Sequence, residues 1–236
     1  MRIALLGDVA LIGMFDCTQT QEVFERVEGV KQLVSDCDYV ICNLETPLTN
    51  KKNTFICKGA YLRSAPENVE VLKRIGVTHV TLANNHIFDY GKQGAQDTIS
   101  VLEKNHIGYC GLCDDPLLLT DGKDRVLIDG FCCYSANGIY YGDRPLSTQL
   151  LSYDSLKRFL NRATTENCLP LARRFSTPTW LPTYRVVLTS SPSPKANRRA
   201  STCLPHVTRG RVTRYHSSKA VASRQPMASP TSTTDW

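Results

Sequence analysis

Short strand-like runs alternate with amphipathic segments along the first two thirds of the chain, and this alternation most restricts the fold. Runs short and apolar enough for strands of a buried sheet occur at 3–6, 39–42 and 77–82. Between the first two, valines recur at helical spacing over 23–34. Further along, Asp129-Gly130 between two apolar runs predicts a hairpin. We therefore expect a layered α/β domain with a largely parallel sheet.

The alternation stops near Asn161, and the composition changes at the same point. Residues 1–161 carry 16 Lys and Arg against 20 Asp and Glu, a net charge of −4, whereas residues 162–236 carry 12 against 2, a net charge of +10. The second part also holds 22 Ser and Thr but a single Gly. Such a segment buries too little apolar surface to offset its ordering entropy. We expect one domain over 1–161 and a basic tail over 162–236 that is disordered or translated out of frame.

Several classes of protein are disfavoured by composition and pattern. No stretch of about eighteen apolar residues is present, so we expect no membrane span. The apolar run after Met1 is too short for a signal peptide, which favours a cytoplasmic protein. Most of the ten cysteines are interpreted as small buried residues. Cys110 and Cys113 have redox spacing, but Asp114-Asp115-Pro116 after them is typical of a loop. Nucleic-acid binding through the basic tail is a weaker alternative, which salt-sensitive binding would support.

Polar residues follow three successive predicted strands. Asp8 follows the first, Asn43-Leu44-Glu45 the second and Asn84-Asn85-His86 the third. Each group alone is more typical of a turn or a structural histidine. Because the carboxyl ends of parallel strands meet at one edge of a sheet, all three should converge there. Carboxylate, amide and imidazole groups bind Mn, Mg, Fe or Zn, and paired metals can clamp a phosphoryl oxygen. The coincidence therefore predicts a metal or phosphate site.

Three segments also resemble a known family. GDVALIG (7–13), VICNLETPLT (40–49) and VTLANNHIFDYGKQGAQDTISVLEKNHIGYCG (80–111) are similar to the bacterial capsule synthesis protein family, often called CapA and linked to poly-gamma-glutamate synthesis. The resemblance covers about residues 1–160. Members resemble calcineurin-like metallophosphoesterases, which implies a metallophosphatase-like fold and a divalent metal cofactor.

The resemblance also implies roles for single residues. It places Asp8, Glu45 and Asn85 at metal-ligand positions, with His86 where related enzymes steady the leaving group or transition state. The spacing adds that Asp89 could accept the other ring N–H of His86 and fix its tautomer.

The chain departs from the family pattern in its second half. Members continue with a His-Trp-Gly strand end and a Gly-His-His-Pro-His cluster that complete the metal site, and this chain has neither. We therefore expect an incomplete domain with an impaired phosphoesterase-like site that acts at a phosphate or acyl-phosphate in polymer assembly or release. The alternative is a non-enzymatic accessory module that binds an anionic polymer or a capsule synthase complex. Related proteins are membrane-associated.

Overall fold

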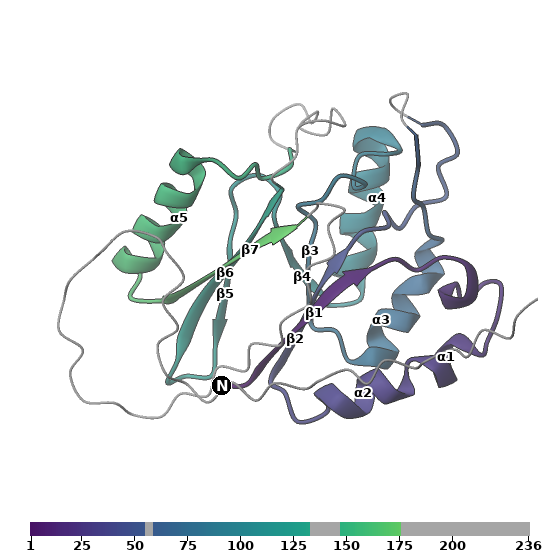
Figure 1. Cartoon of the computed structure of the whole chain (residues 1–236), viewed down its shortest axis with the longest axis horizontal. Helices are drawn as coiled ribbons and strands as arrows, with labels where there is room; N and C mark the ends of the chain where they lie inside the picture. The colour runs from purple at the N-terminus through teal and green to yellow at the C-terminus, as the bar shows by residue number, and fades with distance from the viewer. Residues whose placement is uncertain (55–58, 133–146, 176–236) are drawn as a thin grey trace, which may run out of the picture. The chain divides into compact units, whose positions relative to one another are not determined.

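The computed structural model describes residues 1–54, 59–132 and 147–175, which form four layers (Figure 1). At the centre lie two sheets. The first is parallel, with the order β1-β2-β3-β4, and its strands are Ile3–Val9, Tyr39–Leu44, His79–Thr81 and Gly108–Cys110. The second has the order β5-β6-β7, with strands Leu117–Thr120, Arg125–Cys132 and Leu169–Phe175. Its β5–β6 pair is antiparallel and its β6–β7 pair is parallel.

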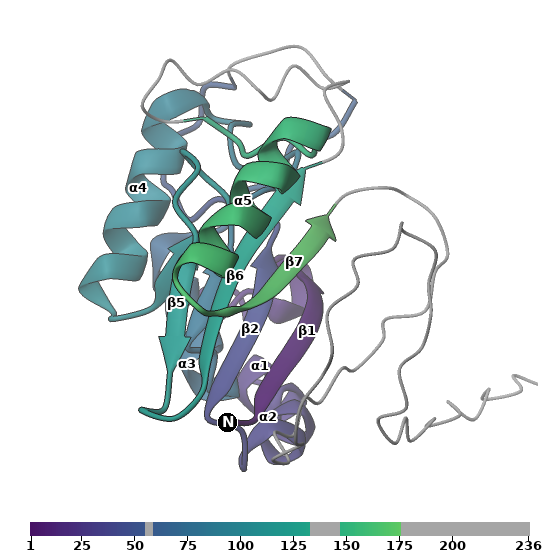
Figure 2. The same ribbon diagram turned by 90° about the vertical axis from the view of Figure 1, so that its left-hand side faces the viewer.

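Helices form the two outer layers, as the views in Figure 1 and Figure 2 show. Four helices cover the free face of the first sheet: α1 (Val23–Arg26), α2 (Glu28–Val34), α3 (Val69–Ile75) and α4 (Gly91–Lys104). The fifth, α5 (Tyr153–Thr165), covers the free face of the second sheet. Two short 3₁₀ turns, Gly13–Phe15 and Pro66–Asn68, complete the described elements. No helix in the described ranges is both long and apolar enough to span a bilayer.

Alternation along the strands produces three separate apolar layers. On β2, Val40 and Cys42 pack with the helices, whereas Ile41 between them packs with the second sheet. The second sheet alternates in the same way, because Ile128 faces the first sheet while Leu127 joins a cluster with α5. A strand whose two faces are both covered needs apolar residues at every position, as the sequence pattern suggested. The expected layered α/β architecture is therefore confirmed.

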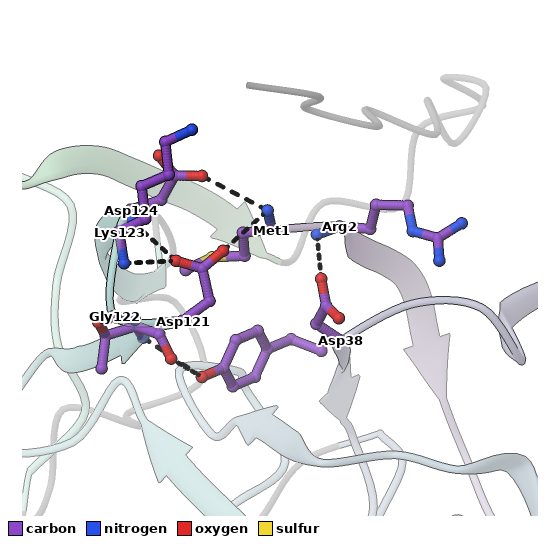
Figure 3. Close-up of polar contacts among 9 residues, drawn as sticks. Met1, Arg2, Asp38, Asp121, Gly122, Lys123 and Asp124 are labelled. Carbon is purple, nitrogen blue, oxygen red and sulfur yellow. Dashed lines mark hydrogen bonds and ion pairs between the residues drawn. The ribbon is translucent and has the colours of Figure 1, made fainter. Parts of the chain in front are cut away.

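Polar contacts at one end tie the two sheets together. The Met1 ammonium group lies 3.0 Å from a carboxylate oxygen of Asp121 and 3.4 Å from one of Asp124, in the turn between β5 and β6 (Figure 3). Asp121 also accepts hydrogen bonds from the backbone N–H groups of Lys123 and Asp124, so the turn is ordered by its own carboxylate. These contacts raise the pKa of the Met1 amino group and lower that of Asp121.

The predicted hairpin at Asp129-Gly130 is wrong. Both residues lie inside β6, which runs unbroken from Arg125 to Cys132. Gly130 serves a close approach between the sheets, because a Cβ atom there would lie 2.9 Å from the Cβ of Thr81 in β3. Glycine therefore marks a contact here and not a turn.

The predicted boundary after residue 161 is placed too early. Helix α5 continues to Thr165, and β7 pairs with β6 along its full length, from Val126 opposite Leu169 to Cys132 opposite Phe175. The composition of the basic segment gave no sign of this strand, because a parallel partner on β6 supplies the order that propensity does not. The part of the predicted tail beyond Phe175 lies outside the described residues.

Candidate functional site

Asp8, Asn43 and Thr81 form a row across the carboxyl edge of the first sheet. Asp8 is the register partner of Asn43, and Asn43 is the register partner of Thr81. The Asn43 side chain is fully buried and donates from Nδ2 to Oδ1 of Asp8 at 2.9 Å. It accepts on Oδ1 from the Thr81 hydroxyl at 3.3 Å. The parallel register therefore brings the first two predicted clusters together, with Asn43 orienting the Asp8 carboxylate.

Asn84 links this row to the loop that carries the histidine. Its fully buried side chain donates to Oδ1 of Asn43 at 3.1 Å and to the carbonyl of Leu44 at 2.8 Å. Its Oδ1 accepts from the backbone N–H groups of His86 and Ile87, at 2.9 and 3.0 Å. A single amide thus uses both its donors and its acceptor to fix the path of the chain after β3.

His86 and Asp89 form the pair expected from their spacing. Nδ1 of His86 lies 2.8 Å from Oδ2 of Asp89. Because a carboxylate only accepts, the ring carries its hydrogen on Nδ1 and presents Nε2 away from Asp89. The same Oδ2 accepts from the backbone N–H of Leu62 at 2.7 Å, so Asp89 also anchors the segment after β2. The Asp89 side chain is 1% exposed and that of His86 is 13% exposed, which leaves the ring the more accessible of the two.

Glu45 follows β2 and lies at the same edge. Its backbone N–H donates to the carbonyl of Val9 at 3.0 Å. Burial raises the pKa of the Glu45 carboxyl, repulsion from Asp8 raises it further, and His86 acts in the opposite direction. The carboxylate therefore lies within electrostatic reach of both residues. Asn85, between Asn84 and His86, is half-buried in the same loop.

The predicted metal ligands are only partly assembled. Asp8 and Glu45 are oxygen donors of the right kind, and their mutual repulsion is what a cation between them would relieve. However, the described part of the chain contains no group of three or more His, Cys, Asp or Glu side chains placed to hold a metal ion. Residues 133–146, which follow β6, lie outside the described residues. The metal site at Asp8, Glu45 and Asn85 therefore stays a prediction.

The remaining sequence candidates do not form a site. Cys110 ends β4 and is buried, and burial raises the pKa of its thiol well above the usual range, whereas Cys113 is exposed. No helix begins at Cys110, as a thioredoxin-like pair would require. Between them, Gly111 adopts a φ of +88° and approaches the backbone of Ala83 so closely that a Cβ would lie 2.7 Å away. The local sequence is therefore explained by packing.

Comparison with known proteins places the similarity over the elements that carry these residues. The model of the family described as bacterial capsule synthesis protein PGA_cap matches residues 2–121, just over half of the chain. The PGA biosynthesis protein CapA of Bacillus subtilis is 37% identical over 105 residues, which cover 44% of this chain and 26% of that protein. The capsule biosynthesis protein CapA of Bacillus anthracis is 38% identical over 95 residues, which cover 39% and 22%. A probable polyglutamine synthesis accessory protein of Mycobacterium tuberculosis is 33% identical over 108 residues, which cover 43% and 28%. The match thus spans about a quarter of the length of these relatives.

Two solved structures superpose in part on this chain. NAD nucleotidase of Haemophilus influenzae superposes with a TM-score of 0.47 and 11% identity, over 73% of this chain and 34% of that one. A putative 5'-nucleotidase of Staphylococcus aureus, solved with alpha-ketoglutarate, gives a TM-score of 0.45 and 15% identity, over 73% and 36%. Both scores are below 0.5, so neither bears on the activity.

Proposed function

This chain belongs to the bacterial capsule synthesis protein family, and from that premise we propose that it takes part in capsule or poly-gamma-glutamate biosynthesis through an impaired, metal-dependent phosphoesterase-like site. The observation that carries the proposal is the gathering of Asp8, Glu45 and the His86–Asp89 pair at one sheet edge. Carboxylates beside an oriented imidazole are the groups that chemistry at a phosphate or acyl-phosphate requires.

We assign a separate role to each residue of the candidate site. Asp8, Glu45 and Asn85 would hold a divalent ion, which supplies polarisation of a phosphoryl oxygen when bound. In its doubly protonated form, His86 would donate a hydrogen bond or proton from Nε2 to the leaving oxygen while Nδ1–H stays on Asp89. Asp89 would stabilise that positive charge and keep the ring oriented. Asn43 and Asn84 would position Asp8 and the histidine loop through their buried hydrogen bonds.

We expect low activity because the histidine clusters that complete the family's metal site are missing from this sequence. An incomplete ligand shell weakens both the charge and the geometry offered to an ion. The test is Mn²⁺ binding by calorimetry together with turnover of a chromogenic phosphodiester. Weak binding that is lost in Asp8→Asn, with little turnover, is the expected result. Strong Mn²⁺-dependent turnover that His86→Ala abolishes would contradict the impairment.

The second candidate is a non-enzymatic accessory module that binds an anionic polymer or a synthase complex. The name of the Mycobacterium tuberculosis relative, an accessory protein, and the net charge of +10 over residues 162–236 favour it. Binding of poly-gamma-glutamate that is unchanged in Asp8→Asn and His86→Ala, without turnover, would support the module over the enzyme.

A further inference from the structure

A separate cavity lies between the second sheet and α5, on the face of that sheet which points away from the first sheet. It has a volume of about 230 Å³, and its walls come from β6, from α5 and from the segment between β4 and β5. The lining residues are Asp114, Pro116, Asp129, Arg158, Phe159 and Arg162. At ~30 Å³ per water, the volume equals about eight water molecules, which suits a small metabolite. None of these residues belongs to the edge that carries Asp8 and His86.

Asp129 is the unusual member of this lining. It is 1% exposed and sits on β6 between Leu127 and Phe131, which pack with α5 in an apolar cluster. Its Oδ1 accepts from the backbone N–H of Gly130 at 2.8 Å, but its Oδ2 is buried without a hydrogen-bond partner among the described residues. A buried carboxyl oxygen with no partner costs free energy, so a ligand that donates a hydrogen bond to it would be stabilised there.

The charge around Asp129 favours a positive ligand group. Burial raises the pKa of the Asp129 carboxyl to about 7, and repulsion from Asp114 and Asp115 contributes in the same direction. The backbone N–H groups of Gly130 and Gly111 act against this rise, but neither donates a hydrogen bond to Oδ2. The potential at the carboxyl therefore contains a negative contribution from Asp114 and Asp115. A ligand ammonium group would relieve this repulsion and satisfy the unpartnered oxygen together.

The other charged residues of the lining favour an anionic group. Arg158 and Arg162 are one helical turn apart on α5 and lie on the same face. Each pairs through Nε, Arg158 with Asp114 at 3.0 Å and Arg162 with Glu166 at 2.7 Å. A guanidinium carries five N–H donors, so both retain donors for a carboxylate. Both side chains are about half exposed, which places them at the mouth of the cavity.

We propose that this cavity binds a small zwitterion of the amino-acid class, with its ammonium group on the Asp129 carboxylate and its carboxylate on Arg158 and Arg162. The buried acceptor and the two guanidinium groups at the mouth match the two charges of such a molecule. The proposal does not depend on the phosphoesterase-like site.

The test is titration of the full chain with a panel of the standard L-amino acids, followed by NMR shifts of the Gly130 and Phe159 amides. We expect saturable binding of at least one member, at least tenfold weaker binding of its 2-hydroxy analogue, and a similar loss in Asp129→Asn. Arg158→Gln and Arg162→Gln should also weaken binding. Lys157→Gln is the matched control, because it removes a positive charge from the same helix outside the cavity lining. Absence of binding by every member, or equal binding of the 2-hydroxy acid, would overturn the proposal.

The pH dependence gives a second readout. The groups facing Asp129 are Cys110 of β4, Asp114 and Asp115 of the following segment, and Arg158 and Arg162 of α5, while its β7 neighbour is the uncharged Ala172. Since the ammonium group needs an ionised Asp129, binding should weaken as the pH falls below about 7. Binding that strengthens as the pH falls would instead indicate an anion on the neutral carboxyl and contradict the proposal.

Discussion

Single buried amides and carboxyls, more than the exposed ionisable groups, determine the geometry of both sites. The Asn43 and Asn84 side chains are fully buried, and they form hydrogen bonds with each other and with Asp8, Thr81 and the backbone. Buried amides of this kind are worth little when satisfied but are costly to break, because the partners stay buried and unpaired. They therefore act on the site by fixing the positions of its chemical groups.

The first prediction concerns Asn84. Asn84→Ala leaves the side-chain Oδ1 of Asn43, the backbone carbonyl of Leu44 and the backbone N–H groups of His86 and Ile87 without this partner. At ~1–3 kcal/mol for a buried unsatisfied group, the loss of unfolding free energy should be about 3 kcal/mol or more. Urea denaturation measures it, and Asn53→Ala at an exposed position serves as the control, with an expected change within ~0.5 kcal/mol. A loss in Asn84→Ala no larger than in the control would show that the network is not stabilising.

The second prediction concerns Asp129 and pH. Its pKa is raised from the ordinary value of 3.8 to about 7, so the folded state keeps a proton that the unfolded state loses. The stability of the native chain should therefore fall as the pH rises from about 4 to about 7, because ionisation then favours unfolding. At ~1.4 kcal/mol per pKa unit, the change is on the order of 4 kcal/mol at most.

Asp129→Asn isolates this contribution. The stability of the variant relative to the native chain should be lowest below pH ~4, where Asp129 of the native chain is protonated in both the folded and the unfolded state. It should be highest above pH ~7, where Asp129 is ionised in both states. The Nδ2 group of the new amide has no acceptor, which lowers the stability of the variant at every pH. The measured quantity is therefore how the free energy of unfolding changes with pH, and not its absolute value. Denaturant unfolding at several pH values would give that slope, and equal slopes in both proteins would refute the shift.

At the scale of elements, the sequence predicted what apolar periodicity and strand-end chemistry can encode. The buried runs at β1, β2 and β3 form strands as predicted, and Nδ1 of His86 lies beside Oδ2 of Asp89, because each feature depends on local spacing. The role of this pair in a site stays a prediction. The continuity of β6 could not be predicted, since Asp129-Gly130 has the composition of a turn and only the nearness of Thr81 explains the glycine. Asn43 and Asn84 stood in the predicted clusters, but the sequence alone does not show which amide is buried.

The third prediction tests the contact between the sheets. In Gly130→Ala the added Cβ would lie 2.9 Å from the Thr81 Cβ and 3.3 Å from the Ala83 Cβ, so strands of both sheets must shift. Overpacking of this kind costs ~1–3 kcal/mol. Gly29→Ala in α2 is the matched control, because its Cβ would meet nothing within 4 Å and alanine favours the helix by ~0.5–1 kcal/mol. Opposite signs of the two changes in thermal unfolding are expected, and a neutral Gly130→Ala would show that the sheets separate easily.

At the scale of the whole molecule, the four layers depend on segments from both sides of the break in composition. The acidic part supplies the first sheet and its helices, whereas the last strand of the second sheet comes from the basic part. The charge profile predicted a boundary but placed it too early, because it reports the average composition of a segment and not the pairing of one strand. The candidate site needs the first sheet, and the cavity under α5 needs the second.

The last prediction uses truncation to separate the contribution of β7 to stability from that of the residues after Phe175. A chain that ends at Asn161 loses β7 and the last turn of α5, which exposes the β6 edge and removes Ala163 from its cluster with Phe159. An open edge of this kind both destabilises the sheet and promotes association between chains. A chain that ends at Phe175 keeps every described element, and its missing segment carries the Ser/Thr/Pro-rich composition that buries little apolar surface. We therefore expect the 1–175 chain to unfold at the temperature of the full chain, and the 1–161 chain to unfold several degrees lower or to aggregate. Circular dichroism melting with light scattering measures both, and a 1–161 chain as stable and monomeric as 1–175 would mean that β7 is dispensable for the domain.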